Sequence, residues 1–228
     1  MIITIDGPSA SGKSSLARAL AKELFFYYLN TGLLYRACAY ILTTEYNCDK
    51  ETLKTIDYAT VKNYFQEKPF FYSYDQIHKE SILYQNQDIT RFLKTSELDA
   101  LSSAASTNMS IRQIVFDIQQ SIALGHDLIV DGRDCGTVLF PYAKHKFYLT
   151  ASLEIRAVRW QHDQAQLKNF YTLEESREHV RTRDNQDSSR KHAPLRIAED
   201  AFVIDNSTFT FQQTLERIRS HINQTKQF

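Results

Sequence analysis

The sequence is poor in glycine, proline and cysteine, and these shortages exclude several kinds of protein. Six glycines and four prolines among 228 residues leave no obvious flexible linker and no low-complexity tract. The three cysteines, Cys38, Cys48 and Cys135, are odd in number, widely spaced and without a CxxC pair. This pattern argues against a disulfide framework and against a zinc site, and it suits a reducing compartment.

The chain also lacks an excess of either charge and any long apolar run. Its 27 Lys and Arg residues balance its 27 Asp and Glu residues, so no overall basic field attracts nucleic acid or an anionic membrane. A strand-like run, Ile2–Ile5, follows Met1 without a basic leader, and nowhere are about 20 apolar residues consecutive. We therefore expect a cytoplasmic, monomeric protein whose partners are small molecules, with no nucleic acid and no membrane.

Short apolar runs alternate with helical patterns along the chain. Ile2–Ile5 predicts a buried strand, and the three- and four-residue spacing of apolar residues in Lys13–Leu24 predicts a helix with one buried face. Further strands are predicted at Asp127–Asp131, Lys146–Thr150 and Ala201–Asp205. This alternation indicates an α/β fold of three layers, with a parallel sheet between helices.

The stretch from about Glu51 to Thr95 has a different character. Pro69–Tyr74 and Ser81–Tyr84 are rich in aromatic residues and predict an inserted antiparallel hairpin or small sheet. The link Asp75–Glu80 contains no Asn-Gly or Asp-Gly pair, so the register of the two strands stays open.

A phosphate-binding loop stands between the first strand and the first helix. Gly7–Ser14 reads GPSASGKS, which satisfies G-x-x-x-x-G-K-[ST] in the chain context that this motif requires. Its backbone N–H groups and the helix N-terminus would hold phosphate, while Lys13 reaches the outer phosphates and Ser14 ligates Mg²⁺. We predict that ATP is bound by Gly7, Pro8, Ser9, Ala10, Ser11, Gly12, Lys13, Ser14 and Ser15.

Arginines in separate motifs distinguish among P-loop proteins. The chain has no Asn-Lys-x-Asp element of a guanine-specific switch and is short for a motor, whereas a kinase needs several cationic groups around the transferred phosphoryl group. Arg36, Arg112, Arg133 and the segment Arg181–Arg190 supply them. Single arginines also serve as surface salt-bridge partners, and Ser103 could equally be a small residue at a helix contact.

Five segments together resemble bacterial cytidylate kinases over nearly the whole chain. They read DGPSASGKSS, LNTGLLYR, VDGRDCGTVLFP, RDNQDSSR followed by APL, and DAFVID. The resemblance implies phosphoryl transfer from ATP with Mg²⁺ to CMP and dCMP. It also implies one kinase domain with a core of about residues 1–30, 125–155 and 191–228, an acceptor-binding insertion of about 31–124, and a short helical lid of about 156–190.

The resemblance assigns roles to individual residues. Arg36 and Arg133 would bind the CMP phosphate, and the base would be read by Ser103, Arg112 and Asp134. The sugar and the transferring phosphate would contact Arg183, Asp187 and Arg190, and the substrate site would include Thr31 and Tyr35. The catalytic cations would be Lys13, Arg133, Arg183 and Arg190. Asp131 would hold Mg²⁺ through water, although a carboxylate at a strand end can also cap the next turn.

Four residues depart from the family pattern, and two other functions stay open. The departures are Asn30 in place of Asp, Leu33 in place of Ala, Cys135 in place of Ile or Met, and Trp160 in place of a basic residue. The nearer alternative is a P-loop kinase for UMP, AMP or a metabolite such as shikimate. The other is a regulatory protein that uses ATP as a switch.

Overall fold

The computed structural model describes residues 1–77 and 79–224 of the chain. These residues form two compact units, each of which is considered by itself. The first unit combines Met1–Leu24 with the chain from Ile129 onward, and the second is Phe25–Leu128. The predicted division into core, insertion and lid remains a prediction.

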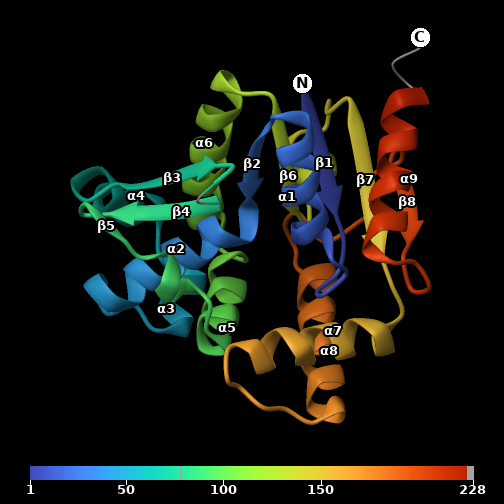
Figure 1. Cartoon of the computed structure of the whole chain (residues 1–228). Helices are drawn as coiled ribbons and strands as arrows, with labels where there is room; N and C mark the ends of the chain where they lie inside the picture. Colours follow the sequence, from blue (N-terminus) through green and yellow to red (C-terminus); the bar gives the residue numbers. More distant parts are fainter. Residues whose placement is uncertain (78, 225–228) are drawn as a thin grey trace. The chain divides into compact units, whose positions relative to one another are not determined.

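Parallel strands form the centre of the first unit (Figure 1). Its strands are β1 (Ile2–Asp6), β6 (Leu128–Gly132), β7 (His145–Thr150) and β8 (Phe202–Asp205), and their order is β6-β1-β7-β8. β1 pairs with β7, and β7 with β8, in parallel. The predicted parallel sheet is therefore confirmed, with strand bounds within two residues of those expected.

The helices of the first unit connect these strands. They are α1 (Lys13–Leu24), α7 (Leu153–Gln166), α8 (Leu173–Ser189) and α9 (Phe211–Gln224), with a π-helical turn η2 (Cys135–Leu139). α1 has the predicted bounds, and its predicted apolar face, which includes Leu16 and Leu20, is buried. α9 lies against α1, where Arg219 forms an ion pair with Glu23.

α7 and α8 follow one another in the chain and pack together within the first unit, where they cross in Figure 1. Thr172 and Glu175 form a capping box at the start of α8, which satisfies backbone N–H groups that would otherwise lack partners. Between the two helices, the Trp160 ring stacks on His179 with 4.2 Å between ring centroids. Trp160, which stands in place of a basic residue of the family pattern, therefore packs between these helices.

The second unit combines helices with a small antiparallel sheet. The strands of this sheet are β3 (Phe70–Asp75), β4 (Lys79–Tyr84) and β5 (Gln87–Asp88), and the unit also contains the strand β2 (Tyr27–Asn30). Its helices are α2 (Thr31–Tyr46), α3 (Lys50–Thr55), α4 (Tyr58–Glu67), the 3₁₀ helix η1 (Thr90–Leu93), α5 (Ser96–Ala105) and α6 (Met109–Gly125).

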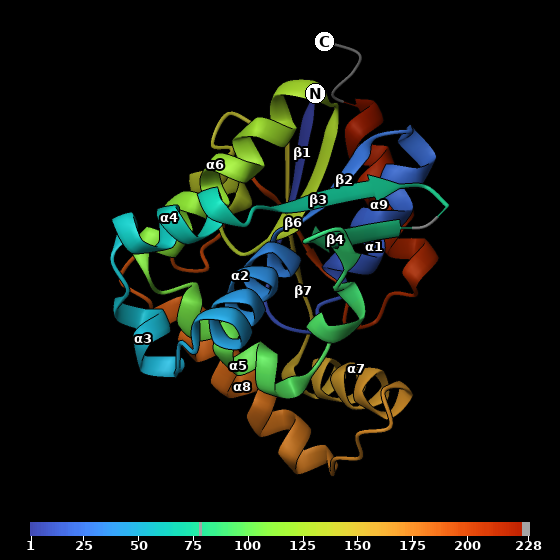
Figure 2. The same cartoon turned by 90° about the vertical axis from the view of Figure 1, so that its left-hand side faces the viewer.

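The aromatic hairpin expected in this unit is confirmed and extended by β5. β3 and β4 run side by side in Figure 2, with Phe70 opposite Tyr84 and Asp75 opposite Lys79. β5 then adds a third antiparallel strand beside β4. The Tyr72 hydroxyl donates to the backbone oxygen of Tyr28 at 2.9 Å, which ties the sheet to β2.

Among residues 1–77 and 79–224, we find no helix with the length and apolar character needed to cross a bilayer. The three cysteines are buried and form no disulfide. Both findings agree with the sequence, which contains neither a long apolar run nor a paired cysteine motif.

Candidate active site

The predicted phosphate loop connects β1 to α1, and two of its positions require glycine. A Cβ atom at Gly7 would lie 2.0 Å from the backbone oxygen of Leu149, so only glycine lets the loop pass this strand. Gly12 has a φ of +90°, a conformation that L side chains rarely adopt. The two glycines of the motif therefore allow the turn that presents backbone N–H groups at the start of α1.

Lys13 lies back across this loop. Its Nζ donates to the backbone oxygen of Pro8 at 2.9 Å, and its side chain is buried. Burial, with the positive charge of Arg133, lowers the pKa of Lys13 to about 7, although Asp131 and Asp187 act in the opposite direction. The ammonium group is thus held where an added phosphate charge would favour its protonated form.

Ser14 and Asp131, the two predicted magnesium residues, lie together. Ser14 Oγ donates to Asp131 Oδ2 at 2.6 Å, and Asp131 is buried at the end of β6. Hydroxyl and carboxylate oxygens are hard ligands that suit Mg²⁺ together with phosphate oxygens and water. Within the described part of the chain, no cluster of three or more His, Cys, Asp or Glu residues could hold a metal by itself. The pair fits an ion that is bound mainly by its nucleotide.

Three predicted catalytic arginines surround one carboxylate. Asp187 Oδ2 lies 2.7 Å from Nε of Arg133 and 3.3 Å from Nε of Arg183, and Asp187 Oδ1 lies 3.9 Å from Nη1 of Arg190. Asp187 is only 1% exposed. Burial opposes its ionisation, but the three guanidinium groups hold the pKa of Asp187 well below its usual range.

Asp134 also joins this cluster. Its Oδ1 lies 3.6 Å from Nη2 of Arg190. The first unit therefore brings together Lys13, Arg133, Asp134, Arg183, Asp187 and Arg190 through ion pairs and electrostatic interactions. This set contains four cationic and two anionic side chains.

α7 and α8 hold the phosphate loop through two residues for which the sequence analysis predicted no site role. Asp184 Oδ1 accepts a hydrogen bond from the backbone N–H of Ser9 at 2.8 Å, and Arg156 Nη1 donates to the backbone oxygen of Ser9 at 3.1 Å. Arg156 and Asp184 are themselves ion-paired. Asp184 lies next to the predicted Arg183, which was the one available signal.

A second contact to the loop comes from β8 and α7. Asn206 Nδ2 donates to the backbone oxygen of Ser11 at 3.1 Å, and Arg159 Nη1 donates to Asn206 Oδ1 at 3.0 Å. Asn206 follows β8 directly, so its place at the end of a parallel strand could have indicated it.

Asp6, the last residue of β1, connects the phosphate loop to the segment that follows Arg133. Its carboxylate accepts hydrogen bonds from the backbone N–H groups of Cys135 at 2.9 Å and Gly136 at 2.7 Å. Gly136 has to be small, because a Cβ there would lie 2.9 Å from Thr4 Oγ1. Cys135, which departs from the family pattern, is buried at this turn and forms no disulfide, and its backbone N–H donates to Asp6.

The Asp6 carboxyl provides a test of this connection through pH. Burial raises its pKa to about 6 from 3.8, although the N–H groups of Gly136 and Cys135 oppose the rise. Because the pKa is higher in the folded than in the unfolded state, ionisation of Asp6 lowers the free energy of unfolding as pH rises through 6. Between pH 4 and pH 7.5 the wild type should lose roughly 2 to 3 kcal/mol in this way, and Asp6→Asn should not show this loss. Urea unfolding of both proteins across this range measures it.

The control for this prediction is Asp205→Asn. Asp205 is exposed, and hydrogen bonds from Ser207 lower its pKa, so it does not titrate in this range. Its variant should follow the wild-type curve. If the Asp6→Asn curve ran parallel to that of the wild type from pH 4 to pH 7.5, Asp6 would not be the buried titrating group.

The second unit holds the other predicted acceptor residues. Thr31 is the first residue of α2, where Asn30 Oδ1 accepts a hydrogen bond from the backbone N–H of Leu33 at 3.1 Å. Asn30 therefore caps this helix, as the Asp expected from the family pattern would also do. Leu33 is buried, so this departure lies in the core.

Three of these acceptor residues make local contacts. The guanidinium carbon of Arg112 lies 5.7 Å from the centre of the Tyr35 ring, and Arg112 Nη1 donates to the backbone oxygen of Ser106 at 3.3 Å. Arg36 Nη2 forms an ion pair with Asp99 of α5. Ser103, also on α5, is buried. The roles of Thr31, Tyr35, Arg36, Ser103 and Arg112 remain predictions.

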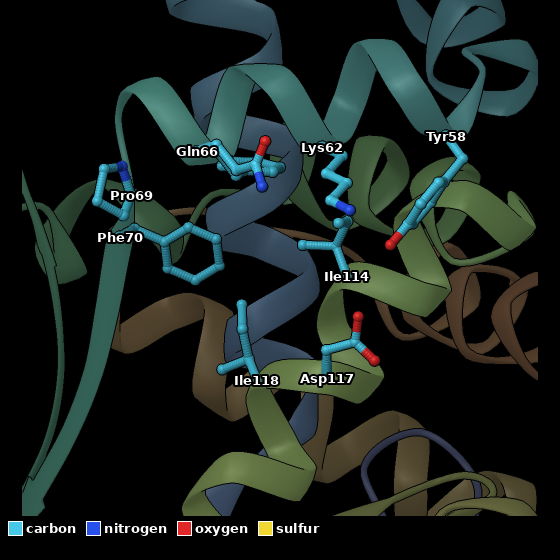
Figure 3. A pocket seen from close by; sticks show the side chains of 9 residues that line it. Tyr58, Lys62, Gln66, Pro69, Phe70, Ile114, Asp117 and Ile118 are labelled. Atoms are coloured by element: carbon cyan, nitrogen blue, oxygen red, sulfur yellow. The ribbon is translucent and has the colours of Figure 1, made fainter.

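A pocket of about 240 Å³ lies elsewhere in the second unit (Figure 3). Its wall is largely apolar, and Lys62 and Asp117 add charged groups from α4 and α6. Its lining residues are Tyr58, Lys62, Phe65, Gln66, Pro69, Phe70, Ile114, Asp117 and Ile118. None of the predicted acceptor residues is among them, so the pocket is separate from that set.

Comparison with known proteins gives matches across the chain. A family model described as cytidylate kinase matches residues 3–224. The cytidylate kinase of Thermodesulfovibrio yellowstonii is 35% identical over 220 residues, which cover 94% of this chain and 94% of the relative. That of Mycoplasma genitalium is 36% identical over 217 residues, with 94% and 93% covered.

A solved structure shares the fold at low sequence identity. The crystal structure of an uncharacterized protein from Eubacterium ventriosum matches with a TM-score of 0.54 at 10% identity, and 98% of each chain is covered. This likeness concerns the fold alone.

Proposed function

The chain belongs to the cytidylate kinase family, and from this premise we propose that it transfers the γ-phosphoryl group of ATP to CMP and dCMP. The products are ADP and CDP or dCDP. The observation that carries the proposal is the cluster of Arg133, Arg183 and Arg190 around Asp187, in the same unit as the phosphate loop. Phosphoryl transfer depends on such cations because charge spreads over the moving phosphoryl group.

The phosphate loop and its lysine would bind the donor. Backbone N–H groups of the loop and the N-terminus of α1 oppose the charge of the β-phosphate, while Lys13 exchanges the Pro8 oxygen for a phosphate oxygen. Ser14 and Asp131 would hold Mg²⁺, Asp131 through water. When bound, Mg²⁺ supplies positive charge to the β- and γ-phosphates.

The arginines would then stabilise the transferring group. Arg133, Arg183 and Arg190 present fixed N–H donors for phosphate oxygens, and the buried Asp187 holds all three guanidinium groups in place. No side chain is needed as a base, because a CMP phosphate oxygen is already charged. The predicted lid, about residues 156–190, would exclude water, which limits wasteful hydrolysis of ATP.

Recognition of CMP would use the residues that were predicted to bind the acceptor. Arg36 and Arg133 bind the phosphate, and Asp134, Ser103 and Arg112 read the base. A carboxylate such as Asp134 accepts a hydrogen bond from the N4 amino group that cytosine has and uracil lacks. Thr31 and Tyr35 complete the acceptor set, and Asp187 with Arg183 reaches the sugar. We also propose that the enzyme is monomeric and that it acts in the cytoplasm.

A panel of acceptors tests this function. We expect kcat/KM for CMP and dCMP to exceed that for UMP and AMP by at least about 10²-fold, since a wrong base leaves buried polar groups unpaired. An assay that couples ADP release to a colour change measures all four. Preference for AMP or UMP would assign another kinase activity, and hydrolysis of ATP that no acceptor accelerates would favour a switch protein.

A further inference from the structure

Arg36, the predicted phosphate ligand of the second unit, already has an anionic partner. Its Nη2 forms an ion pair with Oδ1 of Asp99. Arg36 lies on α2 and Asp99 on α5, and these two helices pack against each other. The side chains are 33% and 17% exposed, so the pair is shielded from water but still accessible to a solute.

A carboxylate and a phosphate group compete for the same donors. Both present two oxygens in a plane that matches the guanidinium fork, and both bind it through charge-assisted hydrogen bonds. A nucleotide phosphate that binds Arg36 therefore has to replace Asp99 or accept a negative charge close to its own. Either event weakens acceptor binding.

The Asp99 carboxylate is not the cap of its helix. Thr95 caps α5, since its Oγ1 accepts a hydrogen bond from the backbone N–H of Leu98 at 3.2 Å. The bond from Ser102 Oγ goes to the backbone oxygen of Asp99 at 2.9 Å and does not use the carboxylate. Replacement of the carboxylate thus leaves both of these contacts in place.

We propose that Asp99 sets the affinity for the acceptor by competing with the nucleotide phosphate for Arg36. This inference rests on the proposed function, in which Arg36 binds that phosphate. Asp99 is an affinity-determining residue, because it keeps acceptor binding weak enough for the diphosphate product to leave.

The test is the KM for CMP of Asp99→Asn, which keeps the shape of the side chain and removes its charge. We expect KM for CMP to fall about three- to five-fold, the upper part of the range that a partly exposed ion pair supports. KM for ATP should stay within about two-fold, because the change concerns one substrate. Asp99→Ser serves as a second variant should the amide disturb folding, and Asp99→Glu should retain a high KM.

The matched control is Asp117→Asn. Asp117 is an exposed carboxylate of the same unit, on α6, and it accepts a hydrogen bond from Gln113 Nε2 at 2.8 Å. It lines the pocket of Figure 3 rather than the acceptor set. The same change of charge there should leave KM for CMP within about two-fold, which separates a local effect from one of net charge.

A double variant separates this inference from the function on which it rests. Arg36→Ala should raise KM for CMP, and adding Asp99→Asn to it should have no further effect, because the contested cation is gone. If Arg36→Ala left KM for CMP unchanged, the proposed role of Arg36 would be wrong. Suppose instead that Arg36→Ala raises KM as expected. If Asp99→Asn alone then raised KM, Asp99 would position Arg36, and if it left KM unchanged, Asp99 would play no part. Either result would refute the competition and leave the role of Arg36 intact.

Discussion

Replacement of Lys13 by alanine should lower kcat by about 10³-fold while the protein stays folded. Lys13 is the one side chain of the phosphate loop that can bring a positive charge to the outer phosphates. Its Nζ, 2.9 Å from the backbone oxygen of Pro8, is already placed at the loop. The coupled ADP-release assay measures the loss, and thermal unfolding checks the fold.

The fold should survive because Lys13 does not stabilise it. A folded-state pKa lowered from 10.5 to about 7 means that burial disfavours the charged ammonium group. The unfolded chain therefore binds the proton more tightly, so the lysine opposes folding below pH 10 and does so most strongly below pH 7. Lys13→Ala should consequently have an unchanged or higher melting temperature at pH 7.

Lys22→Ala is the control for this prediction. Lys22 is an exposed residue in the last turn of the same helix, α1, so its replacement removes one positive charge far from the loop. It should retain full activity. Lys13 would not belong to the catalytic set if Lys13→Ala kept kcat within about ten-fold of the wild type. The same conclusion would follow if Lys22→Ala lost as much of its kcat as Lys13→Ala.

Local sequence patterns predicted the strands of the first unit and its first helix, α1. The strands at Ile2–Asp6 and His145–Thr150 are short runs that are largely buried, and α1 has a clear apolar face, so each could be identified from its own residues. β2 (Tyr27–Asn30) was missed. It has four residues and follows a helix after a single turn, which leaves too few positions for a periodic pattern.

Contacts between distant segments could not be predicted in the same way. Nothing local in the sequence indicates that Asp184 accepts a hydrogen bond from Ser9, 175 positions away, or that Asp6 binds the backbone of Gly136. These bonds depend on where the sheet places the ends of its strands. The motifs predicted candidate site residues, and the folded chain determined which of them meet.

Asp187→Asn should lower the free energy of unfolding by about 3 kcal/mol at pH 7. The variant leaves Arg133, Arg183 and Arg190 without the buried carboxylate that their guanidinium groups share. Like charges held close together without a counterion are destabilising, and the arginines move away from the positions that the transferring phosphate needs. Urea unfolding measures the loss of stability, and the coupled assay should show a parallel fall in kcat.

The dependence of this loss on pH identifies its cause. The pKa of Asp187 is held below the value of an unfolded aspartate, so its contribution is present above about pH 4 and disappears as pH falls toward the folded-state value. The gap between wild type and Asp187→Asn should therefore narrow under acid. Glu178→Gln on the same helix removes an exposed partner of Arg181 at 3.0 Å and should change stability by less than about 0.5 kcal/mol. A constant gap down to pH 3 would mean that Asp187 contributes through packing rather than through charge.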